Sequence, residues 1–341
     1  MEVAHPLATP LTVGGITLRN RAVMVPMARG LAERDGTVSD ALCEHYAARA
    51  RWKTLGLVET EHHYVCPEGQ ATAGQPSIAR DEDVTGLARE CEAVHAFDTP
   101  VLLQLSHAGS AASERVIRQR AIAPSAVTCP GAKVGHPLPR EMDEGDVARV
   151  VEAFAQAARR ARLAGFDGVE VHAAHGYLLD QFLSPLTNQR EDAYGGDLAG
   201  RLRITLEVVR AARSELAAGQ VLSVRLGACD YMAGGTTVAD GVRAAVALAR
   251  AGADLVSVSG GMCYYSRRDT LEPGWFRDAS APIRVELARL GLDVPVLLAG
   301  GIKRPADADA LLAGGDCDLA GFGRSILNNP RWPRRLASPC P

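Results

Sequence analysis

Short apolar runs alternate with longer helical patterns along almost the whole chain, and this alternation limits the fold more than any other feature. The runs are rich in β-branched residues, which favour strands, and each is followed by apolar residues at helical spacing. The expected strands are Ala22–Pro26, Leu55–Thr60, Val101–Leu105, Gly168–Val171, Val221–Leu226, Leu255–Ser259, Val294–Ala299 and Asp318–Phe322. The expected helices are Asp40–Trp52, Asp83–Phe97, Glu144–Ala164, Arg201–Leu216, Ala239–Ala251, Pro282–Leu290 and Pro305–Ala313, with a last one after Arg324.

Strands and helices in this alternation predict a (β/α)₈ TIM barrel. A doubly wound parallel sheet is the alternative, but no Gly-x-Gly-x-x-Gly pattern follows the first expected strand, which disfavours it. We expect one domain over residues 1–341, because no low-complexity linker divides the chain. Two loop excursions, at about 108–141 and 262–281, follow strands. The first is rich in Pro, Gly and Ser and is expected to hold a small element such as a hairpin.

The composition is that of a globular protein with a large core. Of the 341 residues, 47% are hydrophobic and 23% are charged, with a net charge of −3. A charge so close to zero disfavours nucleic acid or a membrane surface as a partner. The first residues lack the basic and apolar regions of a signal peptide, and no apolar run reaches bilayer length. We therefore expect a cytoplasmic protein.

The eight cysteines are scattered, and none forms a Cys-x-x-Cys pair. This spacing disfavours structural zinc and iron–sulfur clusters. We expect no metal site, and we expect most cysteines to be small buried residues in a reducing compartment.

The most informative polar block follows the fourth expected strand and reads HAAHGY, from His172 to Tyr177. In a βα barrel, polar residues at the carboxyl ends of strands are candidates for chemistry. The imidazoles of His172 and His175 could hold a carbonyl oxygen, and the phenol of Tyr177 could deliver a proton. From these residues alone, packed polar side chains are an equally good interpretation. A metal is disfavoured, because no third ligand is evident near the two histidines.

Glycines follow the seventh and eighth expected strands, at Gly300-Gly301 and at Gly323-Arg324. Glycine lets backbone N–H groups approach an oxyanion, and Arg324 adds a charged donor, so we expect a phosphate here. Two tight turns and a surface arginine are the alternative. Arg225, near the end of the fifth strand, requires an anionic or carbonyl partner if it is buried.

With these strands assigned, the sequence resembles the Old Yellow Enzyme family of FMN-dependent NAD(P)H:enone oxidoreductases, nearly from end to end. The most specific block continues from His172–Tyr177 through Phe182-Leu183-Ser184-Pro185 to Asn188, Arg190, Asp192 and Tyr194-Gly195-Gly196. A second block reads QLSHAG and begins at Gln104, and further matches lie at 7–11, 18–21 and 323–324. For Asn188, Arg190, Asp192 and Tyr194 we expect a buried polar network that braces the loop.

The resemblance implies a barrel that binds FMN. The residues that it assigns to FMN are Pro26 and Met27 at the ring, Gln104 and Arg225 at the pyrimidine edge, and Gly300, Gly301, Gly323 and Arg324 at the phosphate. Two positions at this site depart from the family pattern. Many bacterial members carry Cys where this chain has Ala28, and His62 stands where a small residue is common. His62 is therefore either an unusual flavin contact or a structural loop histidine.

The resemblance also implies a reaction in two steps. NADPH or NADH reduces FMN and leaves, and an electron-poor alkene then binds over the same face. His172 and His175 would hold the carbonyl or nitro oxygen while hydride reaches the β-carbon, and Tyr177 would protonate the α-carbon. Larger relatives carry a cysteine-bound cluster that this chain lacks, and the chain ends soon after Arg324. A soluble nicotinamide is therefore the expected direct electron donor.

The leading hypothesis is an ene-reductase that acts on a small-molecule alkene. The alternative is a flavin-dependent dehydrogenase or a redox-neutral double-bond isomerase in a biosynthetic or degradative pathway, which would use the same residues. An aldolase is disfavoured, because no lysine lies at a strand end to form a Schiff base. The sequence leaves the oligomeric state open, a homo-oligomer included. The aromatic residues expected to wall the substrate are Tyr264, Tyr265, Trp275 and Phe276.

Overall fold

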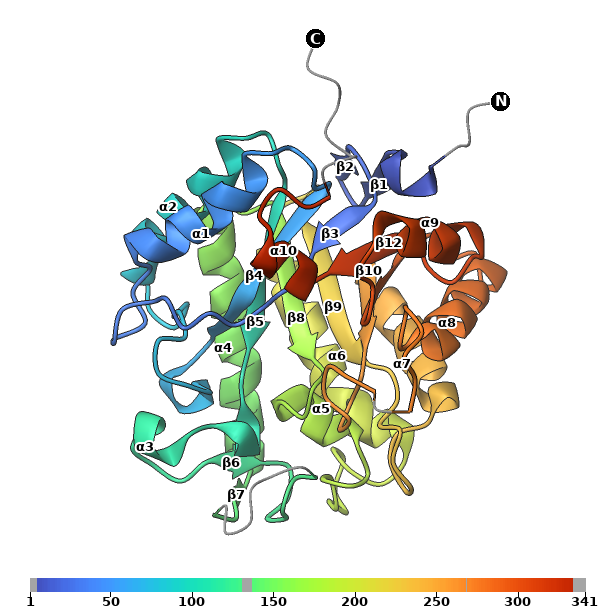
Figure 1. Cartoon of the computed structure of the whole chain (residues 1–341). Coiled ribbons are helices and arrows are strands. Elements are labelled where there is room, and N and C mark those ends of the chain that lie inside the picture. The colour runs from blue at the N-terminus through green and yellow to red at the C-terminus, as the bar shows by residue number, and fades with distance from the viewer. Residues whose placement is uncertain (1–4, 131–136, 268, 334–341) are drawn as a thin grey trace.

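A closed barrel of eight parallel strands forms the centre of the computed structural model, which describes residues 5–130, 137–267 and 269–333 (Figure 1). The strands are β3 (Ala22–Met24), β4 (Leu57–Tyr64), β5 (Val101–Ser106), β8 (Gly168–Ala173), β9 (Val221–Gly227), β10 (Leu255–Ser259), β11 (Val296–Ala299) and β12 (Leu319–Phe322). Successive strands pair in parallel, and β12 closes the barrel on β3. The predicted (β/α)₈ barrel is confirmed.

Helices follow the strands and surround the barrel (Figure 1). They are α1 (Asp40–Ala50), α2 (Asp83–His95), α4 (Glu144–Leu163), α6 (Leu198–Glu215), α7 (Val238–Arg250), α8 (Arg277–Arg289), α9 (Pro305–Ala313) and α10 (Arg324–Asn328). The α4 helix begins with a capping box, in which the Asp143 carboxylate accepts the Asp146 N–H at 2.7 Å and the Asp146 carboxylate accepts the Asp143 N–H at 3.0 Å. Among the described residues, no helix combines the length and the apolar character that a bilayer span requires.

A small hairpin closes the amino-terminal end of the barrel. It consists of β1 (Leu11–Val13) and β2 (Ile16–Leu18), which pair antiparallel. Val13 and Leu18 are buried in one cluster with apolar residues of seven barrel strands, including Leu57 of β4 and Val221 of β9. The opposite end, where the strands terminate, is left for the loops and for polar side chains.

The first excursion differs from the expected hairpin. It contains the 3₁₀ turn η3 (Gly109–Ala111), the short helix α3 (Glu114–Ile117) and the strands β6 (Ile122–Ala123) and β7 (Arg140–Glu141). β6 and β7 pair in parallel, so the hairpin prediction is wrong. Parallel strands need a crossover between them, which a tight hairpin turn cannot provide.

Two strands run at least two residues further than the apolar pattern predicts. β8 continues to Ala173, so His172 lies within the strand and not beyond its end. β4 continues to Tyr64, with a register shift between Glu59 and His62. Backbone pairing continues through polar residues when their side chains find partners inside the protein. Apolar periodicity alone therefore ends such strands too early.

Other differences are local. α8 begins at Arg277, so Pro282, the expected helix start, lies inside the helix. Proline is favoured in a first helical turn, which is why the pattern placed the start there. The remaining short elements are η1 (Pro6–Ala8), η2 (Pro67–Gly69) and α5 (Leu178–Leu183).

We expect Asp143→Ala to destabilise the fold through the start of α4. Loss of a helix cap of this kind costs about 1 kcal/mol of unfolding free energy. Urea unfolding followed by circular dichroism measures it. Asp143→Asn retains a side-chain acceptor for the Asp146 N–H and serves as the control, with a loss well below that of the alanine variant. Equal stability of the alanine variant and the wild type would contradict the assigned cap.

Candidate active site

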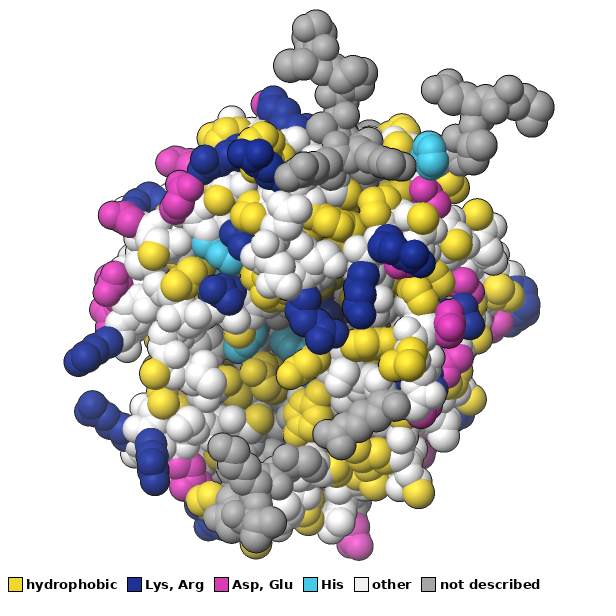
Figure 2. Space-filling view, in the orientation of Figure 1, with side chains coloured by type: hydrophobic (Ala, Val, Ile, Leu, Met, Phe, Trp, Pro, Cys, Tyr) yellow, Lys and Arg dark blue, Asp and Glu magenta, His cyan; other side chains and the backbone are white. Residues whose placement is uncertain are grey.

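Three side chains of the HAAHGY block gather at the carboxyl end of β8. The ring centroids of His172 and His175 lie 5.2 Å apart with nearly perpendicular planes, and the Tyr177 ring lies 4.8 Å from His172. His175 (φ 60°) and Gly176 (φ 70°) both adopt left-handed backbone in the intervening turn. That conformation is uncommon for a non-glycine residue and marks a constrained position. Figure 2 shows histidine side chains within a hollow near the middle of this face, beside a group of Lys or Arg side chains.

Hydrogen bonds fix which nitrogens of the two rings remain free. The Nδ1 of His172 accepts the Ala174 backbone N–H at 3.3 Å, so the proton of the neutral ring lies on Nε2. The Nε2 of His175 lies 2.7 Å from the Ser259 Oγ. When the hydroxyl of Ser259 donates to it, the proton of that ring lies on Nδ1. Each imidazole then offers one N–H donor.

Burial holds all three groups in their neutral forms. It lowers the pKa of His172 and of His175 well below the usual histidine value, and Arg225 and the neighbouring imidazoles lower it further. Burial also raises the pKa of Tyr177 to about 12. The set therefore consists of two neutral hydrogen-bond donors and a protonated phenol near neutral pH.

His62 of β4 lies against the same set, with its ring 5.4 Å from Tyr177 and 6.3 Å from His172. The Gln75 Nε2 donates to the His62 Nδ1 at 2.6 Å, and the Gln75 Oε1 accepts the Ala71 N–H at 2.7 Å. These bonds orient the amide and place the ring proton of His62 on Nε2. Burial lowers the pKa of His62 to about 4, so it is a third neutral imidazole.

Gln104, Glu170 and Arg225 come from the neighbouring strands β5, β8 and β9 and are almost fully buried. The Gln104 Nε2 donates to the Glu170 Oε1 at 2.7 Å, and the Arg225 Nη1 lies 4.0 Å from that oxygen. The Gln104 Oε1 and the Nε and Nη1 of Arg225 have no hydrogen-bond partner in the part of the chain that the structure describes. Buried polar atoms nearly always have partners, so these three point to a bound group that supplies them.

The two glycine-containing ends meet because β11 and β12 are adjacent and parallel. Gly300 (φ 122°) and Gly301 (φ 69°) adopt backbone that other residues rarely adopt. The Gly301 N–H donates to no backbone or side-chain acceptor within residues 5–130, 137–267 and 269–333. Arg324 is exposed, and its guanidinium lies over the Trp275 ring, 5.5 Å from the centroid. An open N–H group beside an exposed cation suits a phosphate.

The segment after β3 borders this region. Pro26 and Met27 are half-buried and Ala28 is exposed. A Cβ added to Gly323 would lie 3.1 Å from the Met27 Sδ, so the methionine packs closely on that glycine. The Glu61 Oε2 accepts the backbone N–H of Arg29 at 2.9 Å, and this hydrogen bond anchors the segment to β4.

The four aromatic residues of the second excursion lie in different surroundings. The Tyr264 hydroxyl donates to the Pro130 carbonyl at 2.9 Å and so joins the two excursions. Tyr265 is 67% exposed, and its ring lies 6.1 Å from His175. The Trp275 Nε1 lies 2.5 Å from the place where a Cβ of Gly301 would be. Phe276 is fully buried. Tyr265 thus lies beside the histidines, whereas Trp275 lies beside Gly301 and Arg324.

The polar network expected after Tyr177 is present, with Asn188 and Arg190 buried but Asp192 exposed at its edge. The Asn188 Nδ2 donates to the Tyr194 carbonyl at 2.7 Å. Arg190 forms an ion pair with Asp192 and donates to the Pro124 carbonyl at 3.0 Å. The network therefore ties the loop after β8 to the first excursion.

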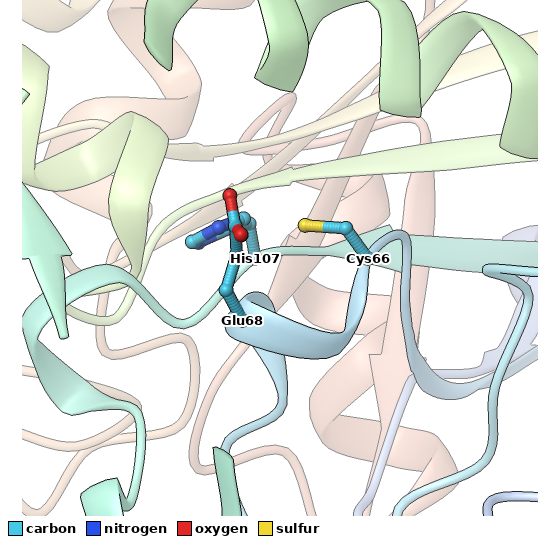
Figure 3. Close-up of side chains that lie close together, drawn as sticks. All are labelled: Cys66, Glu68 and His107. Atoms are coloured by element: carbon cyan, nitrogen blue, oxygen red, sulfur yellow. The ribbon is translucent and has the colours of Figure 1, made fainter. Parts of the chain in front are cut away.

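Cys66, Glu68 and His107 form a second cluster, in which one potential ligand atom of each lies within 4.8 Å of the others (Figure 3). These residue types bind zinc in many proteins. The His107 Nδ1, however, accepts the Gly109 N–H at 3.0 Å, so the proton lies on Nε2 and neither nitrogen offers a free lone pair. Burial also raises the pKa of the Cys66 thiol to about 12. Both features disfavour metal binding at this cluster.

The sequence patterns did not single out Glu59, Glu170 or Gln75. Glu59 and Glu170 each follow a valine within a fully buried strand, and an acidic residue inside such a strand is a signal that could have found them. Gln75 stands in a loop, and only its tertiary contact with His62 reveals its part in the site.

Three comparisons relate the chain to known proteins. The profile of the NADH:flavin oxidoreductase / NADH oxidase family matches residues 6–341. The NADPH dehydrogenase of Geobacillus thermodenitrificans is 38% identical over 332 residues, which cover 97% of this chain and 93% of that protein. The NADH oxidase of Thermoanaerobacter brockii is 35% identical over 325 residues, or 95% of this chain. The chain spans only 49% of that relative. Among solved structures, morphinone reductase in complex with tetrahydroNAD has a TM-score of 0.82 at 31% identity, over 97% of this chain and 90% of that one.

We expect the site histidines to remain neutral in a titration in which His95 gains a proton. The hydrogen bond to Asp167 raises the pKa of His95, whereas burial lowers the pKa values of His62, His172 and His175. Nitrogen NMR of histidine-labelled protein between about pH 8 and about pH 5.5 measures each ring. His95→Gln assigns the control signal. Protonation of a site histidine together with His95 would contradict the electrostatic description.

The same shifts predict how stability changes with pH. In the unfolded chain His62, His172 and His175 take up a proton near pH 6.5, whereas in the folded protein they remain neutral at that pH. The unfolded state therefore binds more protons below about pH 6.5, and the free energy of unfolding should decrease as the pH falls through that value. Urea unfolding at a series of pH values measures this decrease.

Proposed function

Because the chain belongs to the NADH:flavin oxidoreductase / NADH oxidase family of FMN-dependent NAD(P)H oxidoreductases, that of Old Yellow Enzyme, we propose that it is an ene-reductase. It takes electrons from NADPH or NADH and reduces the C=C bond of enones and related electron-poor alkenes. The observation that carries the proposal is the set of neutral His172, neutral His175 and protonated Tyr177 beside unpartnered polar atoms of the barrel. All of these groups lie on one barrel, so a single domain performs the reaction.

The described residues fit FMN at three places. The unpartnered Gln104 Oε1 and Arg225 nitrogens suit the polar pyrimidine edge of a flavin. The Gly301 N–H and Arg324 suit the phosphate, and Met27 offers an apolar surface to the ring. When bound, FMN supplies the hydride chemistry between the nicotinamide and the alkene.

The protein side of the reaction follows from the three neutral groups. The N–H groups of His172 and His175 hold the carbonyl or nitro oxygen of the substrate. Both rings are already oriented, by Ala174 and Ser259, so they stabilise negative charge on that oxygen without rearrangement. Tyr177 donates its proton to the α-carbon as hydride adds to the β-carbon, and burial keeps the phenol protonated until then. The alkene thereby gains one hydride and one proton.

The aromatic residues take different parts in this proposal. Tyr265 walls the substrate, since its exposed ring lies next to His175. Tyr264 holds the second excursion on the first through Pro130. Trp275 supports Arg324 on the phosphate side, away from the expected place at the substrate.

We expect Tyr177→Phe to separate the two half-reactions. Reduction of the flavin by NADPH should be unchanged, whereas reoxidation by 2-cyclohexenone should slow by roughly 100-fold, because a general acid contributes about that much or more. Anaerobic stopped-flow absorbance of the flavin measures both rates. Tyr194→Phe is the matched control, because its hydroxyl donates to Glu207 and takes no part in the site.

The outcomes of this experiment distinguish the hypotheses. Equal loss of both half-reactions in Tyr177→Phe would remove Tyr177 from the proton-transfer role. If NADPH bleaches the flavin absorbance of the wild-type protein and no activated alkene restores it, the dehydrogenase or isomerase hypothesis would be favoured. A wild-type protein that cannot be loaded with FMN would reject the proposed function altogether.

A further inference from the structure

Glu59 of β4 and Glu170 of β8 form a pair of carboxyl groups inside the barrel. Both have 0% exposed surface. Two ionised carboxylates side by side in such surroundings would be strongly unfavourable, because burial penalises each charge and the charges repel. The pair therefore persists only if its protonation state and its partners remove most of that penalty.

The partners of Glu170 are those of an ionised carboxylate. The strand register sets it opposite Gln104 on one side and Ser223 on the other. Its Oε1 accepts from the Gln104 Nε2 at 2.7 Å, and its Oε2 accepts from the Ser223 Oγ at 3.1 Å. The Arg225 Nη1 lies 4.0 Å from Oε1. Two donors and a nearby cation stabilise a negative charge on Glu170.

The surroundings of Glu59 are the opposite. Neither of its oxygens meets a hydrogen-bond donor among the described residues, but the Glu170 carboxylate lies close enough to accept a hydrogen bond from it. Burial and the Glu170 charge raise the pKa of Glu59 well above its usual value, with Arg225 opposing them. A proton on Glu59 turns the repulsion into a charge-assisted O–H···O⁻ hydrogen bond.

We propose that protonated Glu59 donates to Glu170 and thereby positions it for the two residues assigned to the flavin, Gln104 and Arg225. The inference rests on the FMN site of the proposed function. Glu170 occupies the N–H side of the Gln104 amide, which leaves the amide oxygen as an acceptor for an N–H group of the flavin. Arg225 is balanced by one negative charge and not two.

The pair also sets the electrostatic field at the flavin. A negative charge opposes the addition of electrons to a neighbouring group, and a positive charge favours it. Glu170 therefore keeps the reduction potential of the bound flavin below the value that Arg225 alone would give. Glu59 acts as a positioning residue, because its hydrogen bond fixes the Glu170 carboxylate inside the barrel.

The test compares Glu59→Gln, Glu59→Leu and Glu170→Gln with the wild-type holoprotein. The readouts are the dissociation constant of FMN and the midpoint potential of the bound flavin. Gln at position 59 retains an N–H donor for Glu170, so both readouts should stay close to wild type. Leu removes the donor, so FMN binding should weaken about tenfold, the scale of one charge-assisted hydrogen bond. The potential should change as well, because the Glu170 charge is then no longer held in place beside Gln104 and Arg225.

Glu170→Gln removes the negative charge outright, so its potential should be the most positive of the series. Thr205→Val is the matched control, since this hydroxyl is also buried without a partner in the described chain but lies on α6, outside the barrel strands. Both readouts should be unchanged in it. Glu59→Met replaces Glu59→Leu if the latter does not fold, as judged by circular dichroism.

Equal shifts in Glu59→Gln and Glu59→Leu would overturn the inference, because the donor would then be irrelevant. An unchanged potential in Glu170→Gln would overturn it as well. Both results presuppose that wild-type protein binds FMN. A wild type that binds no FMN would instead reject the proposed function together with this inference, so the two failures are distinguishable.

Discussion

The parallel register of β5, β8 and β9 is the constraint on which the rest of the site depends. It sets Glu170 opposite Gln104, and His172 opposite Arg225. Residues two apart on a strand share a face, so Glu170 and His172 both belong to the barrel interior, one layer above the other. A shift of one residue would turn both layers outward and leave Arg225 without a counter-charge. In the proposed function the lower layer serves the cofactor, and the upper layer sets a substrate residue, His172, beside a cofactor residue, Arg225.

Burial is the main cause of the protonation states that the chemistry needs. It lowers the pKa values of the imidazoles, and it raises those of Tyr177 and Glu59. Every one of these shifts favours the uncharged form, which is what a low dielectric environment requires. Hydrogen bonds then choose the direction of each donor, as Ala174 does for His172. The site is thus a set of neutral, oriented donors around one buried ion pair.

The fold was predictable because its signal is repeated. Each βα unit carries the same apolar pattern, so an error at one boundary, such as Pro282 in α8, leaves the barrel unchanged. The position of His172 was predictable for the same reason, since strand ends share one edge. The role of Glu59 was not, although the residue lay inside an expected strand, because apolar periodicity assigns no function to a carboxyl group in the barrel interior. The place of Trp275 depends on how an irregular loop packs, which no periodicity records.

The unpartnered atoms also affect the stability of the folded protein. The Gln104 Oε1 and the buried nitrogens of Arg225 each lack a partner among the described residues, and such atoms cost about 1–3 kcal/mol apiece when buried. A ligand that satisfies them binds the folded state and not the unfolded chain, so its binding energy adds to the stability of the fold. The polar interior is therefore unfavourable for the empty barrel and favourable for the holoprotein. Cofactor binding and folding are linked through the same few atoms.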